Sequence, residues 1–171
     1  MPRASRRPTR SSTPPVADLS VRVVSVNVSP GGVPKLPVSE QWVGRLGLAD
    51  DRHTEPEPDH GGPDQAVCLY SVEAIARVGA DGHTAFPGAY GENLTLEGME
   101  MDSIAPGDLL TIGEGGLVLE LTKRAEPCQT IAHWFVERRI GRINSRQYPA
   151  DARWYARVVT EGPVRAGDAV R

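Results

Sequence analysis

Short apolar segments rich in β-branched residues alternate with loops rich in glycine and proline along most of this chain. The 171 residues include 18 glycines and 15 prolines, and proline interrupts helix interiors because it lacks a backbone N–H and clashes with the preceding turn. Residues 21–28, VRVVSVNV, are β-branched almost throughout and predict a strand. The SPGGVPKLPV that follows predicts a loop or turn. This alternation favours a fold built mainly from strands.

Further strands are predicted where short apolar runs end at turn residues. These are residues 42–48, 67–70, 94–96, 109–112, 117–121, 154–159 and 164–170. Helices are predicted at 71–79, where Ser71 is a suitable N-cap, and at 128–140, where apolar residues recur at helical spacing. Because the strands outnumber the helices and do not alternate with them, a doubly wound fold is excluded. We expect a mainly β fold with a few helices, arranged as a closed or nearly closed mixed β-barrel.

The positive charge of the chain is concentrated at its start. Residues 1–17 carry four arginines and no acidic residue, although the whole chain has a formal net charge of -3. We expect residues 1–19 to be a disordered basic arm and residues 20–171 to form one domain. An organelle transit peptide has a similar composition, but four prolines within residues 1–17 would break the amphipathic helix that such peptides use.

The composition argues against several classes of protein. A weak net charge does not suit a dedicated nucleic-acid binder, and no run of 18 apolar residues is present to span a membrane. The basic start contains no apolar segment of the kind found in secretory signals. Two cysteines do not make a disulfide framework, so we expect free thiols and a cytoplasmic location.

Cys128 is the first candidate for chemistry. It follows Pro127 at the expected start of the helix 128–140, where the helix dipole would favour a thiolate, and Lys123 and Arg124 add positive charge nearby. A thiolate attacks electrophiles and binds soft metals. The alternative is a small buried residue that happens to begin a helix. Cys68, inside the apolar AVCLY, is predicted to be a thiol of the core.

Three loops combine glycine with polar or charged side chains. Glycine lets backbone amides approach a ligand closely, and exposed amides bind anions. A plain turn would explain the same residues, and none of the loops has the spacing of a Walker or dinucleotide-binding motif. The histidines and cysteines also lack a recognisable zinc spacing. The candidate residues in these loops are Lys35, Arg52, His60, Gly61, Gly62, Glu92 and Asn93.

Seven short motifs occur in a fixed order from residue 20 to the end of the chain. They are GGVPK, GLADDRH, HGGPDQAVCLYS, PGAYGENLTLEG, PGDLLTIG, KRAEPC and WYARVVTEGPVRAGD. Each motif is weak alone, but together they resemble the molybdenum cofactor sulfurase C-terminal (MOSC) domain, in particular its small stand-alone bacterial members. The resemblance implies a β-barrel fold and identifies residues 20–171 as the MOSC domain.

The resemblance also implies that Cys128 is the functional sulfur, and two roles follow for it. In reductases of N-hydroxylated compounds such a thiolate ligates molybdenum, which is held by the dithiolene of a pterin. In sulfur transfer the same cysteine would carry a persulfide. The expected function is therefore a molybdenum-cofactor (molybdopterin) protein, independent of pyridoxal phosphate, that reduces N-hydroxylated substrates. The alternatives are a sulfur carrier with a Cys128 persulfide and a non-catalytic module that binds the cofactor.

The remaining candidates would then surround the cofactor. Lys35 and Arg52 would contact its phosphate or pterin, since cations pair with phosphate oxygens. The His60 loop and Asn93 would hydrogen-bond cofactor or substrate, whereas Glu92 would either do the same or brace a turn. Arg124 would add a further positive charge. The chain shows no flavin, haem or iron–sulfur motif, so reduction of a small-molecule substrate would need an external electron-donor protein. The sequence does not predict the oligomeric state.

Overall fold

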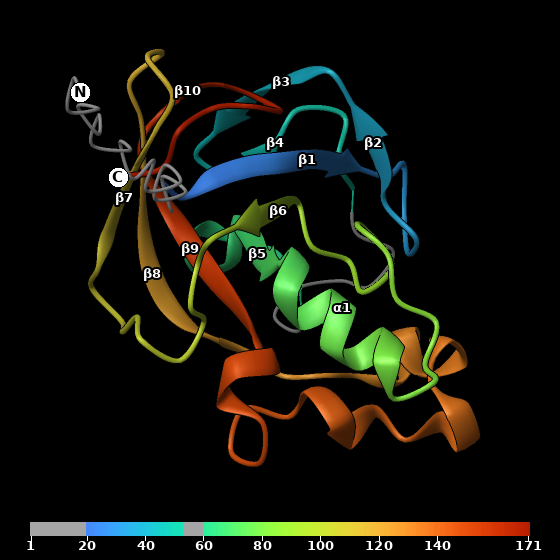
Figure 1. The fold of residues 1–171 in the computed structure, drawn as a ribbon. Helices are drawn as coiled ribbons and strands as arrows, with labels where there is room; N and C mark the ends of the chain where they lie inside the picture. The colour runs from blue at the N-terminus through green and yellow to red at the C-terminus, as the bar shows by residue number, and fades with distance from the viewer. Residues whose placement is uncertain (1–19, 53–59) are drawn as a thin grey trace, which may run out of the picture.

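The computed structural model describes residues 20–52 and 60–171. Strands dominate this part of the chain (Figure 1), which confirms the predicted mainly β fold with few helices. The predicted arm, residues 1–19, lies outside the described residues. The strands are β1 (Arg22–Val28), β2 (Leu36–Val38), β3 (Glu40–Gly44), β4 (Gly47–Leu48), β5 (Val67–Ser71), β6 (Leu94–Glu97), β7 (Leu109–Ile112), β8 (Leu117–Ala125), β9 (Arg153–Thr160) and β10 (Gly162–Arg165).

Two sheets make up the strand part of the structure. Seven strands pair in the order β2-β1-β6-β5-β9-β8-β7, and three pair in the order β10-β3-β4. Strands β5 and β6 are parallel, while the other pairs are antiparallel. The ladder of the large sheet stays open between its edges β2 and β7, and isolated bridges from Ala169 to Arg22 and from Val170 to Ile112 lie near this opening. The predicted barrel is therefore not confirmed.

The main core lies along the inner face of the large sheet. Alternate residues Leu117, Leu119 and Leu121 of β8 are fully buried, while the residues between them are partly exposed. This is the period-2 pattern of a strand with one face in a core. Burying each leucine side chain contributes roughly 1.5–3 kcal/mol to folding. The core thus fixes the register of the strands that carry the site described below.

A second apolar cluster lies beneath the one α-helix of the described residues, α1 (Val72–Ala80). Ser71 caps this helix as predicted, since its Oγ accepts a hydrogen bond from the Ala74 backbone N–H at 3.1 Å. Ile75 and Val78 point into the cluster. Within the described residues no helix is both long and apolar enough to cross a membrane.

The predicted helix at 128–140 is wrong. This segment forms three short 3-10 helices instead, η2 (Gln129–Trp134), η3 (Val136–Arg138) and η4 (Ile140–Ile143). Phe135 is extended, with φ -101° and ψ 134°, and Glu137 has a positive φ of 52°. Packing explains the departure, because Ile131, Phe135 and Ile143 are all buried in the cluster beneath α1, and tertiary contacts override a local helical preference. Cys128 therefore precedes a short 3-10 helix and has no long helix dipole behind it.

Two strand predictions need smaller corrections. Residues 42–48 form a tight hairpin, in which β3 and β4 pair through Val43 with Leu48 and Gly44 with Gly47. Gly47 has a φ of 122°, which favours glycine at this turn. The last predicted strand, 164–170, ends as β10 at Arg165.

The short 3-10 helices η1 (Pro63–Gln65) and η5 (Pro149–Asp151) complete the described elements. Helix η1 leads directly into β5, and η5 leads into β9, so both lie just before strands that carry residues of the site. Proline at the first turn suits both, since its missing N–H has no partner inside a helix start.

Candidate functional site

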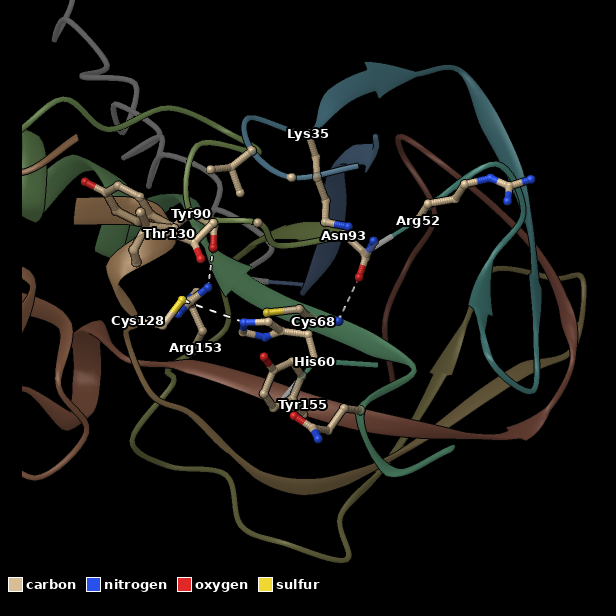
Figure 2. Close-up of a pocket in the computed structure, with 15 residues that line it drawn as sticks. Lys35, Arg52, His60, Cys68, Tyr90, Asn93, Cys128, Thr130, Arg153 and Tyr155 are labelled. Carbon is tan, nitrogen blue, oxygen red and sulfur yellow. Dashed lines mark hydrogen bonds between the residues drawn. The ribbon is translucent and has the colours of Figure 1, made fainter. Parts of the chain in front are cut away.

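A pocket opens where several loops meet the first residues of the central strands β5 and β9 of the large sheet (Figure 2). The loops and short 3-10 helices contribute Gly32, Val33, Lys35, Arg52, His60, Gln65, Tyr90, Gly91, Asn93, Cys128, Thr130 and Ile131 to its wall. Cys68 of β5 and the β9 residues Arg153 and Tyr155 line it from the sheet. Five of the residues predicted from the sequence, Lys35, Arg52, His60, Asn93 and Cys128, are among those that line this pocket.

Cys128 and His60 face each other across the pocket (Figure 2). The Cys128 Sγ lies 3.8 Å from the His60 Nε2, although the two residues are 68 positions apart in sequence. Cys128 is a free, partly exposed cysteine with extended backbone, at φ -124° and ψ 172°. An imidazole at this distance from a thiol can exchange a proton with it and hold the thiolate.

Gly61 and Gly62 form the turn that follows His60. Their φ values are 84° and 79°, in the left-handed region that favours glycine. Gly62 is the N-cap residue of η1. Neither glycine is among the residues that line the pocket, so their contribution in this structure is to turn the chain after His60.

Lys35 is held in a buried ion pair with Asp51. Its ammonium contacts both carboxylate oxygens of Asp51, and each side chain is 5% exposed. Asp51 also accepts hydrogen bonds from the Ser29 backbone N–H at 2.9 Å and from the Asn93 Nδ2 at 2.8 Å. The charge predicted to meet a phosphate is thus already neutralised by a carboxylate that the sequence analysis did not single out.

Asn93 ties this network to the second cysteine. Its Oδ1 accepts a hydrogen bond from the Cys68 N–H at 3.0 Å, and its own N–H donates to the Cys68 carbonyl at 2.8 Å. Asn93 is 2% exposed. Its side chain therefore braces the sheet behind the pocket as well as lining it.

Glu92 lies behind the pocket wall and does not line the pocket. It is fully buried, and its Oε1 accepts hydrogen bonds from the Gly88 N–H at 2.7 Å and the Thr95 hydroxyl at 3.3 Å. Burial raises the pKa of this carboxyl, while the bond from Gly88 lowers it. Of the two expectations for Glu92, the geometry fits the bracing of a turn.

The two predicted arginines lie in different places. Arg52 is exposed and lines the pocket, with its guanidinium pointing away from Cys128 (Figure 2). Arg124 lies outside the set of lining residues. Its guanidinium stacks over the Trp154 ring, 4.1 Å from the centroid, and donates to the Pro149 carbonyl at 3.0 Å. The structure does not bring Arg124 to the site.

The sequence analysis missed Arg153 and Tyr155. Both lie on β9 two positions apart, and alternation along a strand places such residues on one face. A charged residue at an inward position of an apolar strand is the signal that could have found Arg153. Burial raises the pKa of the Tyr155 hydroxyl to about 12, so it stays protonated in the neutral range.

Cys68 is buried, as predicted for a core thiol, but it also lines the pocket. It is 5% exposed, and burial raises its pKa to about 11, against a lowering by the nearby Arg153. It is therefore a neutral thiol at physiological pH. The described residues contain no cluster of three histidine, cysteine or carboxylate side chains able to hold a metal ion by themselves.

Comparison with known proteins identifies the family. The MOSC domain model matches residues 56–171. The chain belongs to the MOSC domain family. This match covers more than half of the chain and includes both pocket cysteines.

Two bacterial proteins are among the relatives of this chain. YflK of Bacillus subtilis is 30% identical over 120 residues, covering 64% of this chain and 48% of YflK. YiiM of Escherichia coli is 29% identical over 142 residues, covering 80% of this chain and 61% of YiiM. The MOSC chain described here thus spans about half to three fifths of the length of these relatives.

Solved structures share the fold. YiiM from Geobacillus stearothermophilus superposes with a TM-score of 0.67 at 24% identity, covering 88% of this chain and 67% of its own. YuaD of Bacillus subtilis superposes with a TM-score of 0.73 at 13% identity, covering 88% of this chain and 94% of its own. At these identities the likeness concerns the MOSC fold alone.

Proposed function

We propose that this MOSC protein binds the molybdenum cofactor and reduces N-hydroxylated compounds, with the Cys128 thiolate as the protein ligand to molybdenum. The family is associated with this cofactor, and one observation carries the assignment to this pocket. The partly exposed Cys128 thiol lies 3.8 Å from the His60 imidazole inside a pocket built from the family's motifs.

The donor set in the pocket fits a metal that arrives with ligands of its own. Thiolate sulfur suits soft metals, and Cys128 offers one such ligand on the pocket wall. Since the described residues hold no cluster of three ligating side chains, a bare ion would lack most of its coordination sphere. A metal already chelated by a pterin dithiolene needs only one further sulfur from the protein.

The rest of the pocket offers a cation and an accessible stretch of backbone that a pterin phosphate could contact. Arg52 at the wall is the exposed cation available to a phosphate, because the Lys35 ammonium is paired with Asp51. Gly91 lines the pocket with a φ of 83°, which leaves its backbone open to close approach by a ligand. When bound, the cofactor would supply the two-electron chemistry that removal of an N-hydroxyl oxygen requires.

The chain's own residues would handle protons and position groups. The His60 Nε2 would take the Cys128 proton as the thiolate forms, since it is the imidazole nitrogen facing the sulfur. The Tyr155 hydroxyl, with its pKa raised to about 12, would stay a hydrogen-bond donor to the substrate. Gly61 and Gly62 would serve by turning the chain so that His60 faces Cys128.

A sulfur carrier is the second candidate, and the same Cys128–His60 pair favours it. A partly exposed thiolate next to an imidazole could attack the outer sulfur of a donor persulfide, release the donor thiolate and later pass this sulfur to an acceptor, while Cys68 is too buried to serve as the carrier. A module that binds the cofactor without turnover is the third candidate. In each case we propose that residues 20–171 form the MOSC domain and act in the cytoplasm on a small molecule, and the reductase would need an external electron-donor protein.

Metal analysis separates these candidates. The chain would be expressed in a host that makes the cofactor, and we expect about one molybdenum per chain, lost in Cys128→Ala. Cys68→Ala is the matched control, because it removes the other pocket cysteine and should keep the metal. Metal-free protein with cyanide-labile sulfur on Cys128 would support the carrier instead. Bound metal without turnover of any N-hydroxylated substrate, with a chemical or protein donor, would support the binding module.

A further inference from the structure

Arg153 is a buried cation without a carboxylate partner. The residue is 5% exposed, and no salt bridge to it occurs within the described residues. Its Nη1 donates to the Tyr90 carbonyl and its Nη2 donates to the Glu126 carbonyl at 3.3 Å. Its Nε is buried without an acceptor. Leaving a buried charge without an anion is costly, so this arrangement suggests a missing partner.

The carboxylates closest to Arg153 form no ion pair with it within the described residues. The Asp51 carboxylate is already paired with Lys35. Glu92 approaches no closer than the limit of an ion pair, and its Oε1 is occupied by Gly88 and Thr95. Arg153 thus has no ion-pair partner within the described residues, although the attraction of the buried Glu92 acts on it from a distance, and it lies on the wall of a pocket that also contains Cys128.

The two bonded carbonyls hold the guanidinium in place on the wall of the pocket that Cys128 also lines. Glu126 is two positions before Cys128, and Figure 2 shows Arg153 and Cys128 on the same side of the pocket. A guanidinium has five N–H donors in a planar fork, and two are used here. The remaining donors suit the two oxygens of a carboxylate or phosphate group.

We propose that Arg153 forms an oxyanion subsite at the Cys128 end of the pocket, so that the ligand engaged by Cys128 carries a carboxylate or phosphate group. This inference deepens the proposed function, because it concerns the same pocket and names a chemical feature of what enters it. It is separate from the contact proposed for Arg52, whose guanidinium points away from Cys128.

Alkylation of Cys128 by a charged and a neutral reagent of similar size tests this proposal without any metal. Iodoacetate carries a carboxylate, whereas iodoacetamide is neutral. The rate of each would be measured on the Cys128 peptide by mass spectrometry, at constant ionic strength to suppress long-range steering. We expect Arg153→Gln to lower the ratio of iodoacetate to iodoacetamide rates about tenfold, as loss of one charge-assisted hydrogen bond predicts.

Matched variants separate a local contact from a general charge effect. Arg157→Gln removes an arginine from the same strand, half exposed and paired with Glu120 and Asp64, and should leave the ratio unchanged. Arg153→Lys keeps the charge but loses the fork, so it should lower the ratio less. In the wild type, inorganic phosphate and acetate should each slow labelling by iodoacetate. The anion that does so at lower concentration identifies the phosphate or the carboxylate as the preferred group.

An unchanged ratio in folded Arg153→Gln, verified by its melting temperature, would overturn the subsite. If that variant does not fold, an unchanged ratio in Arg153→Lys together with no competition by either anion would overturn it equally. These outcomes do not touch the molybdenum content of the chain. Failure of the subsite and failure of the proposed function are therefore distinguishable.

Discussion

The two cysteines of the pocket differ in burial and in the groups that surround the sulfur. Cys68 lies within a buried strand, is 5% exposed, and has a pKa raised to about 11 by burial. Cys128 lies in a loop, is partly exposed, and faces the imidazole of His60 at 3.8 Å. One pocket thus holds a buried thiol and a partly exposed thiol that contacts an imidazole. The surroundings of each sulfur, rather than its residue type, decide which of them can act.

The largest expected difference between the two cysteines is in their rates of alkylation. At pH 8 a thiol of pKa about 11 is only about 0.1% ionised, and burial also blocks the reagent. We expect iodoacetamide to label Cys128 faster than Cys68 by on the order of a thousandfold in the native protein. Peptide mapping after timed labelling measures both rates, and labelling in denaturant should remove the difference. Similar labelling rates of Cys68 and Cys128 in the native protein would contradict this expected difference.

The second-largest effect is expected for the buried ion pair between Lys35 and Asp51, which lies on the Cys68 side of the pocket and contributes to the stability of the fold. Asp51→Asn leaves the Lys35 ammonium buried without a counter-charge, and loss of one partner of a buried pair costs about 3 kcal/mol or more. Urea unfolding would measure the change in the free energy of unfolding. Asp50→Asn is the matched control, since Asp50 makes one exposed hydrogen bond to Gln41 at 3.2 Å and should change stability little. An equal loss of unfolding free energy in the two variants would show that the Lys35–Asp51 pair does not stabilise the fold.

The smallest effect concerns stability at alkaline pH. Folding raises the pKa of Cys68 from 9.0 to about 11, so the fold favours the neutral thiol. Its contribution to stability is complete below pH 9 and disappears as the pH rises through 11. Wild type should therefore lose about 2 kcal/mol more than Cys68→Ala between pH 9 and pH 11.

The alkaline experiment has an internal control in the other cysteine. Cys128→Ala keeps Cys68 and should lose stability as the wild type does. Tyr70 and Tyr90, whose pKa values are also raised by burial, titrate in all three proteins and cancel in the difference. Tyr155 responds to the charge on Cys68, so its change is part of the Cys68 effect that is measured. Chemical denaturation at a series of pH values measures this difference in unfolding free energy. Parallel curves of unfolding free energy against pH for wild type and Cys68→Ala would contradict a buried neutral thiol.

Local sequence patterns were sufficient to predict most of the strands and the start of α1. The alternating leucines of β8 and the Ser71 hydroxyl define a strand and a helix start through residues that are close in sequence. These elements can therefore be predicted from the sequence. The helix predicted at 128–140 failed because its apolar residues pack against segments far away in sequence. Ile131 and Phe135 are buried as the pattern required, but through 3-10 turns and an extended residue.

The sequence predicted only some residues of the candidate site, because contacts between segments far apart in sequence also decide which residues line the pocket. Motifs that carry glycine and cysteine predicted His60 and Cys128 as site residues, and both line the pocket. Arg153 was missed and Arg124 was favoured because proximity in sequence to Cys128 was taken as proximity in space. Strand β9 brings Arg153 to the pocket, whereas Arg124 turns away to stack on Trp154.

Gly88 limits how far such a pocket can vary. It has a φ of 86°, its N–H is bonded to Glu92, and a Cβ placed on it would collide with the Lys35 carbonyl. Two loops of the pocket thus touch through bare backbone, and no side chain is available there to be enlarged or trimmed. A wider or narrower opening would have to come from lining side chains such as Tyr90, Thr130 or Tyr155, because Gly88 and Lys35 already meet through backbone atoms.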